Sequence, residues 1–179
     1  MKIPPNSRTN RGRNANQLDV CEFIEQDARK NAYGQTVQYF IHKYKLKPDL
    51  DSLKRIYRTI YRASPTFAPD SKHLQTIRSF DRLLKDRKGN CVDFTAVISS
   101  FLIALGIPHL YRMVSFDEPE DMNHIFIVAF IDGDKYILDV NTGLALMGKA
   151  LQNNKVFSIL QSFGITKPYK YKYDKFIRL

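Results

Sequence analysis

The segment from residue 87 to residue 108, RKGNCVDFTAVISSFLIALGIP, restricts the local structure more than any other part of the chain. Asn90 suits a helix N-cap, because its side-chain oxygen can accept hydrogen bonds from the free N–H groups of a first turn. Gly106 suits the residue after a helix, and Pro108 follows it. We therefore predict a central, largely apolar helix over residues 91–105. Cys91 would be its first residue.

Strands are predicted after this helix and further helices before it. Residues 109–116, 124–131 and 135–140 have the composition of strands; the loop DEPEDMN separates the first two, and DGD forms a tight hairpin between the last two. On the N-terminal side, apolar residues recur at intervals of three and four. This spacing predicts two helices within residues 17–45, which break near Tyr33 and Gly34. This order of elements is typical of an α+β fold.

Two further segments lie between these helices and the central one. Asp51 is expected to cap a third helix that runs to about residue 62. Residues 71–85 are expected to be helical or irregular and to lead into the turn at Gly89 and Asn90.

Charge is distributed unevenly along the 179 residues, whose formal net charge is +10. Residues 1–16 hold four basic and no acidic residues, and residues 167–179 hold five basic residues and one acidic residue. We expect residues 1–16 to be a flexible basic arm, residues 17–166 a single domain, and residues 167–179 a basic aromatic extension. An anionic partner such as nucleic acid would then contact the tails in a nonspecific way, and not a basic cleft.

Several function classes lose support from the same sequence. Cys21 and Cys91 lie 70 residues apart with no zinc-type Cys or His spacing, which favours free thiols and no metal site. No apolar run of membrane-spanning length and no signal peptide is visible, so we expect no membrane contact and a protein that stays where it is made. Phosphate-binding glycine loops are absent as well, and we expect no cofactor.

Three residues have types and positions that suit nucleophilic chemistry. Cys91 would lie in a first helical turn, where N–H groups and the helix dipole stabilise a thiolate. The alternative is an inert core cysteine, which is the commoner role of a lone thiol. His124 begins a strand, where a histidine is often only a satisfied polar residue at the edge of a sheet. Asp139 interrupts an apolar strand, and its alternative role is to cap the turn that follows.

The predicted hairpin brings two of these residues together. If residues 132–133 form a two-residue turn, Ile131 pairs with Asp134, and His124 and Asp139 become diagonal neighbours on one face of the sheet. A shift of one residue would place them on opposite faces. With the thiol they would form the minimal set for nucleophilic acyl transfer.

The motifs GNCVDF, LGIP, HIFIVAF and YILDVNTG, in this order, resemble the transglutaminase-like superfamily, relatives of the papain-like cysteine peptidases. The resemblance covers about residues 76–143 and points to a small bacterial or bacteriophage-type member. It implies a helix that carries Cys91 and packs on an antiparallel sheet. It also implies Cys91 as the nucleophile, His124 as the general base and acid, and Asp139 as the carboxylate that orients the imidazole.

This resemblance implies attack on an amide or ester carbonyl of a protein or peptide through an acyl-enzyme thioester. Release to water would make the protein a peptidase or amidase, and release to an amine would make it a transglutaminase. The Cys91 N–H is a natural donor to the oxyanion. The nearby residues considered for a second donor, none of which is assigned, are Lys85, Asp86, Arg87 and Asn90.

Two further positions near the motifs are Tyr136 and Asp93. Tyr136 stands where members of the superfamily often have a tryptophan, a residue type that this chain lacks. Asp93 is interpreted as a first-turn acid that the helix dipole favours, and not as a catalyst.

A different class of function remains open beside the enzyme. The fold could be the scaffold of a structural or assembly protein, for example a component of a bacteriophage particle. In that case the basic tails would contact nucleic acid or other protein chains, which would also hold the N-terminal arm. The location would accordingly be the cytoplasm or a virus particle.

Overall fold

The structure is a computed structural model, and it describes residues 7–10, 17–64, 66–70, 74–114, 124–140 and 175–178. Its main helices are α1 (Gln17–Ala32), α2 (Gln35–Tyr44), α3 (Leu50–Ala63), α4 (Phe80–Asp86) and α5 (Cys91–Leu105). Its main sheet contains β5 (His109–Val114), β6 (His124–Ile131), β7 (Asp134–Leu138) and β8 (Lys175–Arg178). Short paired strands are β1 (Ser7–Asn10) with β3 (Leu74–Ile77), and β2 (Thr66–Phe67) with β4 (Lys88–Gly89). This mixture of helices and an antiparallel sheet confirms the predicted α+β class.

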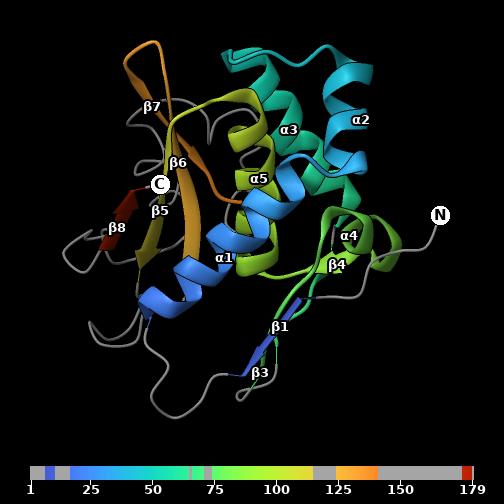
Figure 1. Cartoon of the computed structure of the whole chain (residues 1–179), viewed down its shortest axis with the longest axis vertical. Helices are drawn as coiled ribbons and strands as arrows, with labels where there is room; N and C mark the ends of the chain where they lie inside the picture. Colours follow the sequence, from blue (N-terminus) through green and yellow to red (C-terminus); the bar gives the residue numbers. More distant parts are fainter. Residues whose placement is uncertain are drawn as a thin grey trace, which may run out of the picture.

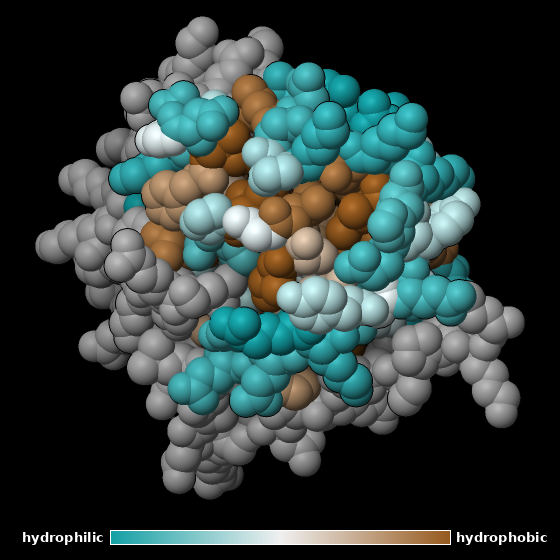
Figure 2. All heavy atoms as spheres, turned by 45° about the horizontal axis from the view of Figure 1, so that its top comes forward, coloured by the Kyte–Doolittle hydropathy of each residue, from teal (hydrophilic) through white to brown (hydrophobic). Residues whose placement is uncertain are grey.

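Helix α5 lies at the centre of the fold. It contacts α1, α2 and α3 on one side and β6 on the other, so it joins the helical half to the sheet (Figure 1). The core consists of apolar side chains from all of these elements. Figure 2 shows one face, on which hydrophilic residues surround a patch of hydrophobic ones. Among the described residues, no helix has the length and apolar character needed to cross a membrane.

Both ends of α5 are as the sequence predicts. The Asn90 side-chain oxygen accepts hydrogen bonds from the N–H groups of Val92 and Asp93, and the Asp93 carboxylate accepts one from the Asn90 N–H. This reciprocal capping box satisfies donors that a helix N-terminus otherwise leaves free. At the other end Gly106 has a φ of 68°, a left-handed conformation that glycine adopts without steric cost.

The N-terminal helices agree with the sequence pattern except at the start of α3. The break predicted near Tyr33 and Gly34 separates α1 from α2. The prediction that Asp51 caps the third helix is wrong, because Asp49 is the N-cap and accepts a hydrogen bond from the Ser52 N–H. The backbone of Asp49 is extended, as a cap requires, whereas Asp51 lies within the first turn.

The main sheet has the strand order β7-β6-β5-β8 with antiparallel neighbours. Ile131 lies opposite Asp134, which confirms the predicted two-residue hairpin. Strand β8 lies in the C-terminal extension, where the residues YKYKYDKFI alternate as in a strand, and it pairs with β5. Residues 149–163, whose sequence pattern is compatible with a helix, lie outside the described residues.

One pairing joins the N-terminal segment to the domain. Strand β1 lies in the segment 1–16, for which we expected a flexible arm, and it pairs with β3. The expectation of a helical or irregular segment over residues 71–85 is wrong for β3 and right for α4. A strand of four residues depends on its partner, and that partner lies more than 60 residues away in the sequence. The rest of the segment 1–16 lies outside the described residues.

Candidate active site

The two cysteines of the chain lie in different environments. Cys21 is fully buried in α1, and burial raises the pKa of its thiol to about 12. Its Sγ donates to the sulfur of Met113 at 3.3 Å. Cys91, the first residue of α5, is only partly buried and is a free thiol. Of the two, Cys91 is therefore the thiol that a substrate can reach.

A buried imidazole and a buried carboxylate lie together at the ends of two paired strands. His124 is the first residue of β6, and Asp139 follows the last residue of β7. The Nε2 atom of His124 lies 2.8 Å from Oδ2 of Asp139. This contact continues the ladder in which Ile127 lies opposite Leu138, so the hairpin register places both side chains on one face.

Opposing effects determine the charge of His124. Burial disfavours the imidazolium, but the charge of Asp139 and its hydrogen bond favour it, and so do a hydrogen bond and charge interaction with Cys91. The favourable contributions outweigh burial and raise the pKa of His124 to about 10. Because Nε2 is bound to Asp139, the nitrogen that remains for the thiol is Nδ1. The imidazole thus interacts with the thiol on one side and with the carboxylate on the other.

Helix α3 contributes a hydrogen bond that holds Asp139 in place. The Tyr57 hydroxyl donates a hydrogen bond of 2.9 Å to the backbone carbonyl oxygen of Asp139. Tyr57 is fully buried, and burial raises the pKa of its phenol further above the ordinary range. The helical spacing of the sequence puts Tyr57 on the apolar face of its helix, and no local signal reveals a partner 82 residues away.

Asp93 holds the start of α5 in place through hydrogen bonds with Arg78 and Asn90. It is fully buried, and its carboxylate accepts hydrogen bonds of 2.6 Å from both the backbone N–H and the guanidinium of Arg78, besides the Asn90 N–H. Burial raises the pKa of Asp93 to about 6, and the hydrogen bonds from Arg78 and Asn90 and the charge of Arg78 oppose that rise. Asp93 therefore ties the segment after β3 to the turn that presents Cys91.

The glycine two residues before the cysteine has a steric reason. A Cβ atom on Gly89 would lie 2.7 Å from a methyl group of Leu83 and 3.1 Å from the ring of Phe94. Contacts this short require the neighbours to move, so the chain passes this point without a side chain. Close packing here sets the path of the backbone into the helix cap at Asn90.

The residues around the site also bear on metal binding and on donors to an oxyanion. No group of three or more His, Cys, Asp or Glu side chains among the described residues could hold a metal ion. Asn90 accepts the cap hydrogen bonds at its side-chain oxygen, so a donation from Asn90 to an oxyanion would have to come from its side-chain nitrogen. The Cys91 N–H is the first of α5 and precedes the N–H groups that this cap binds.

Comparison with known proteins gives a family and one similar structure. The profile of the transglutaminase-like domain matches residues 13–159. Among solved structures, a candidate cysteine protease from Cytophaga hutchinsonii is 22% identical with a TM-score of 0.41, over 71% of this chain and 43% of that one. The chain thus spans less than half of the length of that protein. No curated protein matches the chain. Because the profile covers most of the sequence, the chain belongs to the transglutaminase-like domain family.

Proposed function

We propose that this protein is a cysteine-dependent acyl-transfer enzyme that acts on amide bonds of proteins or peptides. The observation that carries the proposal is the buried His124–Asp139 pair, at 2.8 Å, whose imidazole also interacts with the partly exposed thiol of Cys91. A nucleophile, a base and a residue that orients the base are the parts that such chemistry needs. Membership of the transglutaminase-like family supports the same reaction class.

The first half of the reaction forms a thioester. Proton transfer from the Cys91 thiol to Nδ1 of His124 gives a thiolate–imidazolium pair before the substrate reacts, and the thiolate attacks the carbonyl carbon of the substrate amide. The carbonyl oxygen becomes an oxyanion, to which the Cys91 N–H donates. The C–N bond then breaks, the imidazolium gives its proton to the leaving amine, and the acyl group remains on sulfur.

In the second half of the reaction, water or an amine takes the acyl group from the enzyme's sulfur. His124 removes a proton from water or from an amine, and this nucleophile attacks the thioester carbonyl. The C–S bond breaks, and the sulfur leaves as a thiolate beside the imidazolium, which restores the starting pair. Water gives a carboxylic acid, and an amine gives a new amide. Both outcomes use the same three side chains, so the access of water to the thioester selects between them.

Asp139 has a supporting part in both halves. Its carboxylate holds Nε2 of His124, so that Nδ1 faces the thiol, and it stabilises the imidazolium that forms when the thiol loses its proton. Tyr57 in turn fixes the backbone of Asp139. The imidazole is thus oriented before any substrate binds.

Alkylation of Cys91 by iodoacetamide tests the proposal without knowledge of the substrate. The reagent reacts with thiolates, and Cys21→Ser in every variant removes the other thiol. At about pH 6, we expect His124→Gln to lower the alkylation rate at least about tenfold, because the thiolate loses the imidazolium that holds its proton and stabilises its charge. The matched control is His42→Gln, which removes an exposed histidine of α2 and should leave the rate unchanged. Equal rates in wild type and His124→Gln would contradict the proposed activation.

The two possible acceptors are then separated by trapping. The enzyme is incubated with a glutamine-containing peptide library and a labelled primary amine, and the products are measured by mass spectrometry. Incorporation of the amine indicates transfer, whereas cleaved or deamidated peptides indicate hydrolysis. Cys91→Ala should abolish both products, and any product that this variant still forms comes from another activity.

A further inference from the structure

The outer side of α3 carries concentrated positive charge. Between residues 43 and 62 the chain has seven basic residues and two acidic ones. The inner side of α3 is buried through Leu53, Ile56, Tyr57 and Ile60. The opposite side carries the half-buried Lys54 and the exposed Arg55, Arg58 and Arg62. The tails carry most of the net charge, and folding in addition gathers the basic residues of this near-neutral middle part of the chain onto one face of α3.

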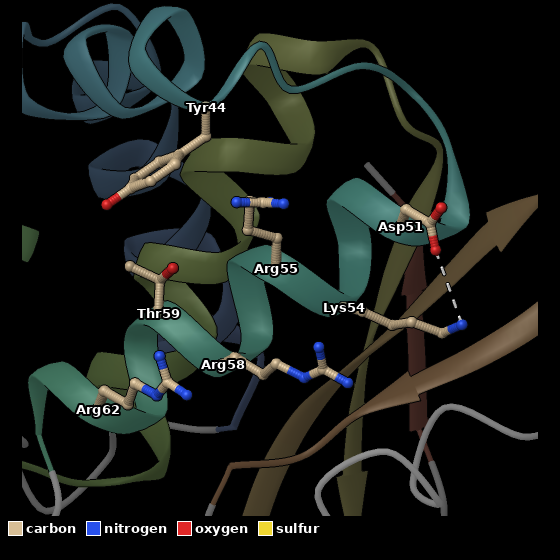
Figure 3. A pocket seen from close by; sticks show the side chains of 7 residues that line it. All are labelled: Tyr44, Asp51, Lys54, Arg55, Arg58, Thr59 and Arg62. Carbon is tan, nitrogen blue, oxygen red and sulfur yellow. Dashed lines mark ion pairs between the residues drawn. The ribbon is translucent and has the colours of Figure 1, made fainter.

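These side chains line a cavity of about 370 Å³, which forms an open groove on α3 (Figure 3). The residues around it are Tyr44, Asp51, Lys54, Arg55, Arg58, Thr59 and Arg62. Asp51 is the single acidic residue of this lining, and it lies 3.9 Å from the Nζ atom of Lys54. Among the described residues, Arg58 and Arg62 form no ion pair. The cavity therefore presents positive charge that no acidic residue in the described part of the chain neutralises at Arg58 and Arg62.

An aromatic surface adjoins the cavity. The guanidinium of Arg55 lies 5.5 Å from the ring centre of Tyr44, and Lys43 lies over the rings of both Tyr39 and Tyr44. Tyr39 is 54% exposed and Tyr44 is 36% exposed. Aromatic rings and basic side chains thus alternate from α2 to the groove on α3.

We propose that this groove binds single-stranded nucleic acid, with its phosphates on the arginines of α3 and its bases toward the tyrosines of α2. Arg55, Arg58 and Arg62 lie along about 10 Å of helix, from a rise of about 1.5 Å per residue. Consecutive phosphates of a nucleic-acid strand are about 3.4 Å apart along a duplex and somewhat further apart when it is extended, so this row meets two or three of them. Guanidinium groups bind phosphate oxygens in a bidentate manner.

The aromatic part of the surface favours a single strand over other anions. Bases that are not paired can stack on tyrosine rings, whereas the bases of a duplex are already stacked on one another. An acidic peptide would contact the arginines, but its carboxylates would not stack on the tyrosine rings. Recognition of this kind does not depend on base sequence, because the contacts are made with phosphates and ring faces.

This proposal is independent of the proposed enzymatic activity. The hydrogen bond from Tyr57 to Asp139 lies on the buried side of α3, and the arginines lie on its exposed side. Substitutions in the groove should leave the alkylation of Cys91 unchanged. Loss of nucleic-acid binding and loss of thiol activation can thus be told apart in the same variants.

Fluorescence anisotropy with a labelled single-stranded DNA of about 20 nucleotides tests the proposal, over salt concentrations from about 50 to 200 mM. The double variant Arg58→Gln/Arg62→Gln should flatten the slope of log K against log salt by about 1.4, since each phosphate contact on a single strand contributes about 0.7. The control Lys30→Gln/Lys88→Gln removes the same charge from exposed positions on α1 and β4, and should leave the slope unchanged. The basic tails contribute equally in all variants.

A second pair of variants tests the bases. Tyr44→Leu should weaken binding about tenfold with the same salt slope, because stacking on one base is lost while phosphate contacts remain. Its control is Tyr33→Leu, which lies in the turn between α1 and α2, is 74% exposed and does not line the groove. Tyr33→Leu should bind as the wild type does.

Four results would overturn the proposal. The first is absence of binding to the wild-type protein at the lowest salt concentration. The second is an equal loss of slope in the groove and control double variants, which would reduce the effect to net charge. The third is a duplex of the same sequence that binds as tightly as the single strand. The fourth is polyglutamate of equal charge that competes as well as unlabelled DNA, which would indicate an acidic protein as the partner.

Discussion

The charge of His124 depends on one carboxylate, and Asp139→Asn changes that carboxylate with little change of shape. In the wild type, burial lowers the pKa of His124, while Asp139 and the interaction with Cys91 raise it to about 10. In Asp139→Asn the burial remains but the main charge that opposes it is gone. We therefore expect the pKa of His124 to fall below the ordinary value of 6.5. The pKa of His124 is thus shifted upward in the wild type and downward in the variant.

The size of the effect follows from the same quantities. The difference between about 10 and 6.5 corresponds to about 5 kcal/mol of preference for the imidazolium. The folded-state pKa of His124 lies above its value in the unfolded chain, so this stabilisation is fully present below about pH 6.5 and is lost as the pH rises through about 10. In Asp139→Asn the linkage has the opposite sign, and unfolding should become easier as the pH falls from about 6.5 through the lowered pKa of His124, because the unfolded chain then binds the proton more readily than the folded one.

Carbon and proton NMR of the imidazole ring measures this charge directly. The chain has four histidines, and the resonance that is missing in His124→Gln identifies His124. Between about pH 6 and 8 its chemical shifts should stay at protonated values in the wild type and at neutral values in Asp139→Asn. The matching free energies of unfolding come from urea titrations at the same pH values.

A second buried histidine provides an internal reference. Burial lowers the pKa of His109 to about 4, with only partial compensation by its hydrogen bond to the carbonyl oxygen of Ile107. Its Nδ1 donates to that oxygen, so its Nε2 accepts from the Ser99 hydroxyl at 2.8 Å. His109 should remain neutral in both proteins over the same pH range. A wild-type His124 that titrates near 6.5, or one that stays charged at neutral pH in Asp139→Asn, would refute the reasoning.

Three substitutions test the packing around the site, each by the free energy of unfolding in urea. Tyr57→Phe removes the buried hydrogen bond to the Asp139 carbonyl and should cost about 1–3 kcal/mol; no change would mean that solvent replaces the hydroxyl. Gly89→Ala would place a Cβ 2.7 Å from a leucine methyl group of α4 and should cost about 1–3 kcal/mol, unless that side chain moves freely. Arg78→Met leaves the buried carboxylate of Asp93 without its cation and should lower the free energy of unfolding by about 3–5 kcal/mol at neutral pH. Part of this loss should be recovered in acid, where the carboxylate becomes protonated. A loss that is independent of pH would contradict the ion pair.

The part of the site that could be predicted depends on short-range chemistry. The bounds of α5 follow from Asn90 and Gly106, because caps act over three or four residues of backbone. The juxtaposition of His124 and Asp139 follows from a two-residue turn, because the turn fixes the register of both strands. The catalytic roles of these residues remain a proposal.

Other elements could not be predicted because they depend on distant partners. Strand β3 is short and forms only because β1 pairs with it. The N-cap of α3 was misplaced by two residues, since both Asp49 and Asp51 are good caps and only the path of the chain chooses between them. The groove on α3 was missed because acidic residues elsewhere cancel its charge in the sum over the sequence.

The amino-acid sequence by itself determined the helix that presents Cys91, the hairpin that pairs His124 with Asp139, and their order along the chain. Each of these depends on hydrogen bonds and backbone conformations within a few residues. Only the tertiary structure decided that Tyr57 supports Asp139, that Arg78 neutralises Asp93, and that the arginines of α3 share one exposed groove. Those contacts arise when the helices and the sheet pack around α5, and the surface that each side chain meets is then set by segments far away in the sequence.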